Sequence, residues 1–288
     1  MKNYLSLIKF SHTIFALPFA LIGFFLSYPE YNFSINLLIY VLLCMIFARS
    51  AAMAFNRYID RDIDTINPRT SKTREIPSKK IKPSSALIFV IFNSCLFIIT
   101  TYFINQLCFF LSPIALLIIL GYSYTKRFTS LCHLILGVGL SLSPIGAYLA
   151  VTETFHIVPI FFSFIVLFWV AGFDIIYSLQ DKEFDTKNNL KSMPVFFGKK
   201  NALRVSKFLH IATVILVFYV GTLNNFSYFY WCGTFVFSAL LIFQHSIISK
   251  DDLSRINIAF FTIIIFIIRI YDRNSLIINN ILLLTFKI

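Results

Sequence analysis

The chain has 288 residues, of which 58% are hydrophobic and only 13% are charged, and its formal net charge is +12. A soluble domain of this length could not bury so much apolar surface, so a mean hydropathy of +0.80 excludes an ordinary water-soluble globular fold. The basic residues lie between apolar runs instead of forming one basic surface. This pattern argues against a nucleic-acid partner and favours a polytopic membrane protein.

Nine apolar runs follow one another along the chain, and each is about long enough to cross a bilayer as a helix. None shows a strand-like alternation of polar and apolar residues, so helices are expected. No small-residue cleavage pattern follows the first run, which predicts an uncleaved first helix. The predicted spans are 10–28, 35–57, 85–104, 107–124, 130–150, 156–179, 204–223, 226–247 and 256–271. The sequence therefore predicts an all-α polytopic fold of nine transmembrane helices, in a single domain over residues 1–288.

The loops between these runs alternate in charge. The loops at 29–34, 105–106, 151–155 and 224–225 contain no Lys or Arg, whereas the loops on the other side hold most of the basic residues. Because Lys and Arg are enriched on the cytoplasmic side of membrane proteins, the N-terminus is expected to be cytoplasmic. Most acidic residues also lie in two of these inside loops. Acidic residues contribute little to orientation, so their concentration there needs another explanation.

The first acidic motif follows the second apolar run. Asn56, Asp60 and Asp64 occur at intervals of four residues, so a continued helix would place them on one face as a polar stripe. Asp62 would then point to nearly the opposite side. Arg57 is expected at the cytoplasmic end of the helix.

The second acidic motif follows the sixth apolar run and reads "DIIYSLQDKEFD". Asp174, Tyr177, Asp181 and Asp185 have spacings of three, four and four residues, which again predict one helix face. Two such stripes at the same membrane surface are able to face each other across a cavity.

Carboxylates that lie so close together repel one another unless a cation lies between them. Hard oxygen ligands suit Mg²⁺, which usually shares its coordination with substrate phosphates. Four basic residues near the motifs also fit a polyanion, namely Arg69, Arg74, Lys126 and Arg127. The pattern predicts a Mg²⁺–diphosphate site at a membrane surface.

Two other interpretations would account for acidic residues in these loops. Solvated loop charges with no shared role would explain a single motif, but two matched motifs on one side disfavour this interpretation. An EF-hand would explain the spacing of Asp60, Asp62 and Asp64. It fails because Thr65 replaces the glycine of the calcium loop and Ser71 replaces its final Glu.

Arg49 lies inside the second predicted span, seven residues before Asn56 and about two helical turns away. A charge within a span normally faces a cavity or a partner. It either binds a substrate carboxylate or pairs with an acidic residue, and the sequence leaves both open. The five histidines show no metal-ligand spacing and are interpreted as structural, and the five cysteines as small core residues.

At these residues the chain resembles the UbiA superfamily of membrane aromatic prenyltransferases. The signatures are the two acidic motifs, the following Arg69–Thr70 pair and the stretch "YSYTKR". The segments "IKFSHTIFALPFAL" and "SMPVFFGKKNA" are similar to the 4-hydroxybenzoate branch and its menaquinone-pathway relatives. The resemblance runs from about residue 4 to residue 265.

The resemblance implies nine helices around a cavity that opens to the cytoplasmic side and to lipid. It implies Mg²⁺ ligands at Asp60, Asp64, Asp181 and Asp185. It implies diphosphate contacts from Asn56, Arg69, Lys126 and Arg127, with Asp174 and Tyr177 positioning the diphosphate. It also implies that Arg49 meets the carboxylate of an aromatic acid.

The expected function is Mg²⁺-dependent transfer of a polyprenyl group from polyprenyl diphosphate to an aromatic acid resembling 4-hydroxybenzoate, in quinone biosynthesis. The alternatives are a dihydroxynaphthoate or haem acceptor, and a membrane transporter. A transporter is disfavoured because its polar residues would lie near the bilayer midplane. A CDP-alcohol phosphotransferase is disfavoured because its glycine-containing acidic motif is missing from the sequence. The expected location is a bacterial inner membrane, with the lipid bilayer as a partner.

Overall fold

The computed structural model describes residues 2–28, 31–249 and 252–256. These residues form helices and connecting loops and contain no strand, which confirms the all-α prediction. Nearly all of the ninth predicted span, 256–271, lies outside the described residues. The helices in chain order are α1 (Lys2–Leu7), α2 (Phe10–Leu26), α3 (Ile35–Ile59), α4 (Arg61–Ile66), α5 (Pro83–Ile104), α6 (Gln106–Thr125), α7 (Cys132–Thr152), α8 (Ile157–Ser178), the 3₁₀ turn η1 (Leu179–Asp181), α9 (Lys182–Lys187), α10 (Met193–Leu223) and α11 (Tyr228–Ser246).

Six helical segments among the described residues are long and apolar enough to cross a membrane. They contain α3, α5, α6, α7, α8 and α10 and coincide with the second to seventh predicted spans. Helices α2 and α11 lie at the first and eighth predicted spans. The chain is therefore built as a multi-pass membrane protein.

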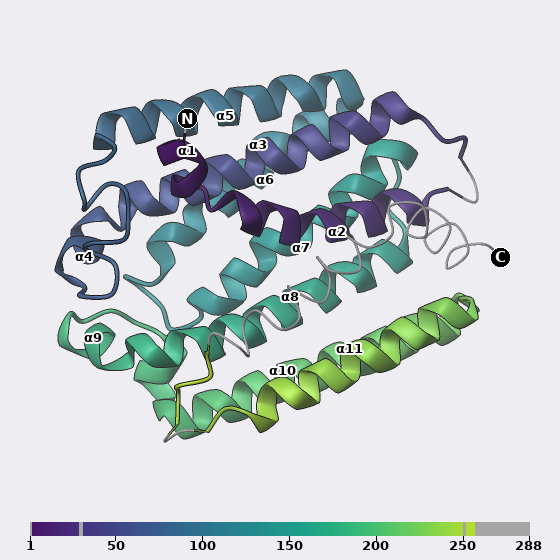
Figure 1. The fold of residues 1–288 in the computed structure, drawn as a ribbon. Coiled ribbons are helices and arrows are strands. Elements are labelled where there is room, and N and C mark those ends of the chain that lie inside the picture. The colour runs from purple at the N-terminus through teal and green to yellow at the C-terminus, as the bar shows by residue number, and fades with distance from the viewer. Residues whose placement is uncertain (1, 29–30, 250–251, 257–288) are drawn as a thin grey trace.

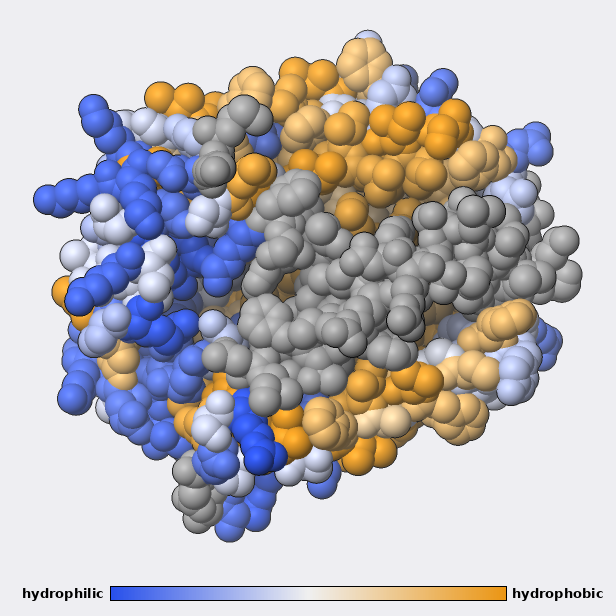
Figure 2. Space-filling model, in the orientation of Figure 1, coloured by the Kyte–Doolittle hydropathy of each residue, from blue (hydrophilic) through white to orange (hydrophobic). Residues whose placement is uncertain are grey.

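The long helices lie side by side, with α5 at the top of Figure 1 and α10 and α11 at the bottom. Helix α7 is central, because it packs against α2, α6 and α8. The short helices α4 and α9 lie at the same end of the bundle, although more than 100 residues separate them. Figure 2 shows hydrophilic residues gathered over this end and hydrophobic residues over much of the remaining visible surface. The fold thus brings both acidic motifs to one polar end.

Helix α10 begins well before the predicted span at 204–223, and this boundary was wrong. It starts at Met193 and contains a kink at Gly198, where φ is +76°. Only glycine adopts this conformation without strain. The kink separates a short apolar helical start, with the sequence MPVFF, from the longer helix that follows.

Helices α7 and α8 approach each other closely at Gly137. A Cβ added at this position would lie 2.5 Å from the carbonyl oxygen of Leu167, which is closer than atoms tolerate. Without a large hydrophobic driving force between helices in lipid, close contact between backbones is a main source of stability. Gly137 therefore sets the distance between the two helices that carry His133 and Asp174.

We expect Gly137→Ala to lower the thermal unfolding temperature of the protein in detergent, because the new methyl group forces α7 away from α8. The matched control is Gly233→Ala on α11, where an added Cβ meets no atom within 4 Å. Both changes gain the same helix propensity, about 1 kcal/mol. An equal unfolding temperature for the two variants would contradict the close packing at Gly137.

Candidate functional site

The first motif lies at a break between two helices. Helix α3 ends at Ile59, Asp60 has φ −85° and ψ 7°, and α4 begins at Arg61. The prediction of one continuous helix was therefore wrong. The backbone hydrogen bonds from Asp60 N to Asn56 O and from Asp64 N to Asp60 O nevertheless keep the helical spacing. As a result Asn56 Nδ2 donates to Asp60 Oδ2 at 3.0 Å, and the polar side chains stay on one side.

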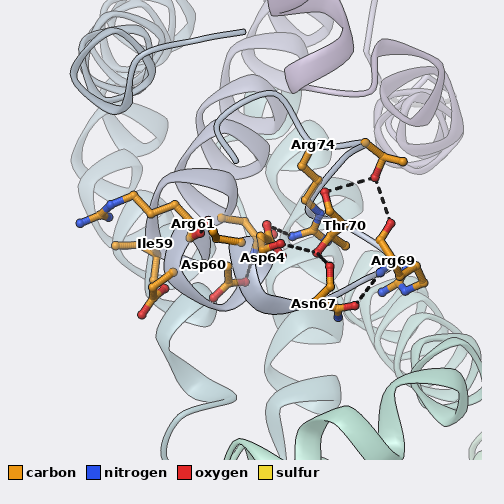
Figure 3. Close-up of polar contacts among 12 residues, drawn as sticks. Ile59, Asp60, Arg61, Asp64, Asn67, Arg69, Thr70 and Arg74 are labelled. Atoms are coloured by element: carbon orange, nitrogen blue, oxygen red, sulfur yellow. Dashed lines mark hydrogen bonds and ion pairs between the residues drawn. The ribbon is translucent and has the colours of Figure 1, made fainter. Parts of the chain in front are cut away.

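The loop after α4 folds back onto Asp64 (Figure 3). Arg74 forms an ion pair with the Asp64 carboxylate, and Thr70 Oγ1 donates to the Asp64 carbonyl oxygen at 3.0 Å. The side chain of Asn67 accepts the backbone N–H of Arg69, a turn-stabilising contact that its side chain favours. Asp64 is consequently buried with a fixed cationic partner.

The second motif is divided among three elements. Asp174 and Tyr177 lie on α8, Asp181 ends the 3₁₀ turn η1, and Asp185 lies on α9. The prediction that one helix face carries all four residues was wrong, because α8 ends at Ser178. The break turns the chain so that Asp181 and Asp185 are buried at the polar end of the bundle.

Ion pairs join the two motifs. Arg69 binds Asp181 through two contacts, Nε to Oδ1 at 3.0 Å and Nη2 to Oδ2 at 2.6 Å, and its Nη1 donates to the Tyr177 hydroxyl at 3.1 Å. Lys126, just after α6, lies 2.8 Å from Asp185 Oδ1. Such two-contact and charge-assisted bonds are among the stronger ones in proteins. The structure thus brings together residues more than 100 positions apart in the sequence.

Asp62 has a role that the sequence did not reveal. Its side chain points outward, as expected, and is 63% exposed. However, Arg127 donates to both of its carboxylate oxygens, at 3.1 and 3.0 Å, and also to the Ile59 carbonyl oxygen at 2.8 Å. This hydrogen bonding holds the pKa of Asp62 below its usual range. Asp62 therefore helps to place Arg127, whose Nη2 lies 3.7 Å from Asp60 Oδ1.

The carboxylates form a site that favours cations. Burial and the neighbouring Asp64 raise the pKa of Asp60 to about 6. This direction means that negative charge is costly at this place unless positive charge compensates it. Arg57 lies in the last turn of α3, at the end of the helix as predicted, but its side chain is buried and only 5% exposed.

Metal binding requires these carboxylates to converge. Among the described residues, no three His, Cys, Asp or Glu side chains are close enough to hold a metal ion. Instead Asp64, Asp181 and Asp185 each pair with a basic side chain, namely Arg74, Arg69 and Lys126. Their oxygen donors at a buried polar end fit Mg²⁺ together with a diphosphate that takes over the basic partners.

An apolar cavity of about 190 Å³ lies among α2, α3, α5, α6 and α7. Arg49 and Tyr122 contribute polar atoms to its lining, while residues such as Leu140 and Ala147 make most of the wall apolar. Within the described residues, Arg49 forms no ion pair, and its Nε has no hydrogen-bond partner. The alternative in which Arg49 pairs with an acidic residue is therefore not what this structure shows.

His133 was interpreted as structural from the sequence but contacts the second motif. Its Nδ1 lies 2.6 Å from Asp174 Oδ2. Its place at the start of α7, six residues after Arg127, was the only available signal. The two α8 residues of the motif therefore have different partners. Asp174 contacts His133, whereas Tyr177 contacts Arg69.

Comparisons with known proteins agree with these features. The UbiA prenyltransferase family matches residues 16–268. The 4-hydroxybenzoate octaprenyltransferase of Aeromonas salmonicida (strain A449) is 30% identical over 202 residues, which cover 70% of this chain and 69% of that protein. The 4-hydroxybenzoate octaprenyltransferase of Legionella pneumophila (strain Lens) is 32% identical over 210 residues, with coverages of 69% and 71%.

Solved structures show the same fold. The apo structure of a UbiA homologue from Aeropyrum pernix K1 has a TM-score of 0.82 and 30% identity, covering 90% of this chain and 96% of that one. A UbiA homologue from Archaeoglobus fulgidus bound to DMAPP and Mg²⁺ has a TM-score of 0.68 and 23% identity, covering 94% and 99%. The resemblance drawn from the motifs is confirmed, and the chain belongs to the UbiA prenyltransferase family.

Proposed function

We propose that the protein is an Mg²⁺-dependent prenyltransferase that moves a polyprenyl group from polyprenyl diphosphate to an aromatic acid resembling 4-hydroxybenzoate, in quinone biosynthesis. The observation that carries this proposal is the joining of two acidic motifs by Arg69 and Lys126 at the polar end of a bundle that also contains an apolar cavity. The names of the curated relatives support the choice of acceptor.

The four metal-ligand candidates are Asp60, Asp64, Asp181 and Asp185. Bound Mg²⁺ would supply charge neutralisation for the departing diphosphate. Arg69, Lys126 and Arg127 would release their carboxylate partners and bind the diphosphate oxygens, and Asn56 would keep Asp60 oriented. Tyr177 would hold the guanidinium of Arg69 in place through its hydroxyl.

The chemistry follows from this placement. Basic side chains that stabilise charge on the leaving diphosphate lower the barrier to breaking the allylic C–O bond. The apolar wall of the cavity would hold the polyprenyl tail and exclude water from the resulting carbocation. An electron-rich hydroxylated ring would then attack this carbon atom, and the ring would lose a proton.

Arg49 would bind the carboxylate of the acceptor. Its guanidinium lines the cavity about two turns of α3 from Asn56, and its Nε is buried without a hydrogen-bond partner. A buried donor without a partner is costly, so a carboxylate ligand at this point would be stabilised. A dihydroxynaphthoate also carries a carboxylate and is the second candidate acceptor, whereas haem is a more distant alternative.

The membrane topology of the chain is also inferred, from its helices and its basic loops. We infer nine spans with a cytoplasmic N-terminus, in one domain over residues 1–288, in a bacterial inner membrane. Helices α2 and α11, with six longer apolar segments, support eight of these spans, and the alternation of basic loops supports the orientation.

We expect Asp60→Asn and Asp181→Asn to reduce prenyl transfer by about 100-fold or more, because each removes a charge that would hold Mg²⁺ and the diphosphate. The assay contains purified protein, Mg²⁺, polyprenyl diphosphate and 4-hydroxybenzoate, and measures product mass. The control is Glu183→Gln, at a position between Asp181 and Asp185 whose side chain is 76% exposed, and this variant should retain activity. A wild-type protein that prenylates no aromatic acid would overturn the proposed function.

We expect Arg49→Met to lower kcat/KM for 4-hydroxybenzoate by about 10- to 100-fold, the loss of one charge-assisted hydrogen bond. The matched substrate is 4-hydroxybenzamide, which has the same shape without the carboxylate charge. Wild type should prefer the acid, and Arg49→Met should lose this preference. If the ratio of kcat/KM values for the two substrates does not change, the carboxylate contact at Arg49 is wrong.

A further inference from the structure

The start of α10 carries two exposed phenylalanines at the polar end of the bundle. Phe196 is 71% exposed and Phe197 is 43% exposed, and their rings pack edge to face with centroids 4.7 Å apart. Both lie in the segment 193–197, which precedes the kink at Gly198. Adjacent exposed aromatic side chains are unfavourable in water and indicate a surface that contacts an apolar partner.

The segment 193–197 is held beside the end of the bundle. The backbone N–H of Met193 donates to Nε2 of the buried His133, at the start of α7, at 3.4 Å. Met193 also belongs to the buried cluster at the end of α8, together with Ala202 on the other side of the kink. The two phenylalanines are therefore kept close to the level at which the apolar helices end.

After the kink, one face of α10 changes from basic to apolar. Lys200, Arg204 and Lys207 follow one another at intervals of four and three residues, so they share a face of the helix, and all three are exposed. The same face continues with Phe208 and Ile211, which are 70% and 48% exposed. In a helix that is long and apolar enough to cross a membrane, such exposed apolar side chains are expected to face lipid.

The three basic residues lie where the headgroups of a bilayer would be. From Lys200 to Phe208 the helix rises by about 12 Å. The headgroup layer on each side of the hydrocarbon core is about 5–8 Å thick. With Phe208 at the edge of the hydrocarbon, Arg204 and Lys207 fall within this layer. Lys200 then lies at its aqueous border, where a long side chain reaches the lipid phosphates.

These three cations are available to an anionic ligand. Helix α10 contains no Asp or Glu, and within the part of the chain that the structure describes none of the three forms an ion pair. Arg204 donates to the neutral Oδ1 of Asn201 at 3.1 Å. Lys199 differs from them, because it lies 2.8 Å from Glu183 on α9. Each exposed basic residue near an anionic bilayer strengthens the attraction to it.

We propose that the start of α10 is a binding site for anionic phospholipid headgroups. Phe196 and Phe197 insert into the interface of the bilayer, and the three basic residues of the following face bind lipid phosphates. Basic and aromatic side chains on one short segment are a combination that binds at bilayer surfaces. An acidic protein would also fit the three bases, but it would not explain why their face continues as an apolar face of the same helix. The site is separate from the proposed prenyl transfer, and its test requires no turnover.

The test of lipid binding measures thermal unfolding of the full chain in detergent, with either phosphatidylglycerol or phosphatidylcholine added. Wild type should be stabilised more by phosphatidylglycerol, the anionic lipid. The variant Lys200→Gln/Arg204→Gln/Lys207→Gln should need about 10-fold more phosphatidylglycerol for the same shift, because three attractive charges are lost. Its response to phosphatidylcholine should not change.

The matched control removes three exposed basic residues from the loop after α4, in the variant Lys72→Gln/Lys79→Gln/Lys80→Gln. This variant loses the same net charge, so it should keep the wild-type response to phosphatidylglycerol. An equal loss of response in both variants means that net charge alone attracts the lipid, and the proposal is then wrong. An unchanged response in the α10 variant overturns it as well.

The test of insertion places Phe196→Trp in nanodiscs whose lipid chains carry bromine close to the headgroup. Wild type, with Trp169 and Trp231, gives the background fluorescence. The added indole should be quenched by the brominated lipid. The control is Glu183→Trp on α9, at a side chain that is 76% exposed, whose indole should be quenched by aqueous iodide instead. If iodide quenches both variants equally and brominated lipid quenches neither, the phenylalanines do not insert into lipid and the proposal is overturned.

Discussion

The two-contact ion pair between Arg69 and Asp181 is the interaction on which the polar end of the molecule depends. It connects the loop after α4 with the turn after α8, and the pair of Lys126 with Asp185 adds the end of α6. Buried carboxylates are strongly destabilising without a partner, because they lose hydration. The ion pairs therefore hold three otherwise separate loops together where the apolar helices end.

The helix breaks at Asp60 and after Ser178 also serve to bring buried carboxylates to their basic partners. Two straight helices would carry their carboxylates along parallel axes, and the later residues of each motif would move away into water. By ending α3 at Ile59 and α8 at Ser178, the chain turns Asp64, Asp181 and Asp185 inward, where they are buried.

The sequence predicted the helices and the pairing of the motifs, because apolar runs of sufficient length and residue spacings are local properties. It could not predict the breaks within the motifs, since they depend on contacts such as Arg74 with Asp64. It also missed His133 and the outward-facing Asp62, whose partners Asp174 and Arg127 lie 41 and 65 residues away. Neither His133 nor Asp62 belongs to a repeated spacing in the sequence that would indicate its contact. The position of Arg49 was predicted, but its lack of an ionic partner required the structure.

The position of α7 along the cavity limits how long a straight hydrocarbon tail in the cavity is able to be. From Leu136, near the polar end, to Ala150, both in the lining of the cavity, the helix rises by about 21 Å. Because Gly137 holds α7 directly against the backbone of α8, the helix cannot slide to extend this space. A hydrocarbon tail that starts at the polar end and lies straight along α7 therefore reaches the end of the cavity after about this distance. Any longer part of the tail must bend or leave between helices into the surrounding lipid, so bilayer chains would solvate its far end.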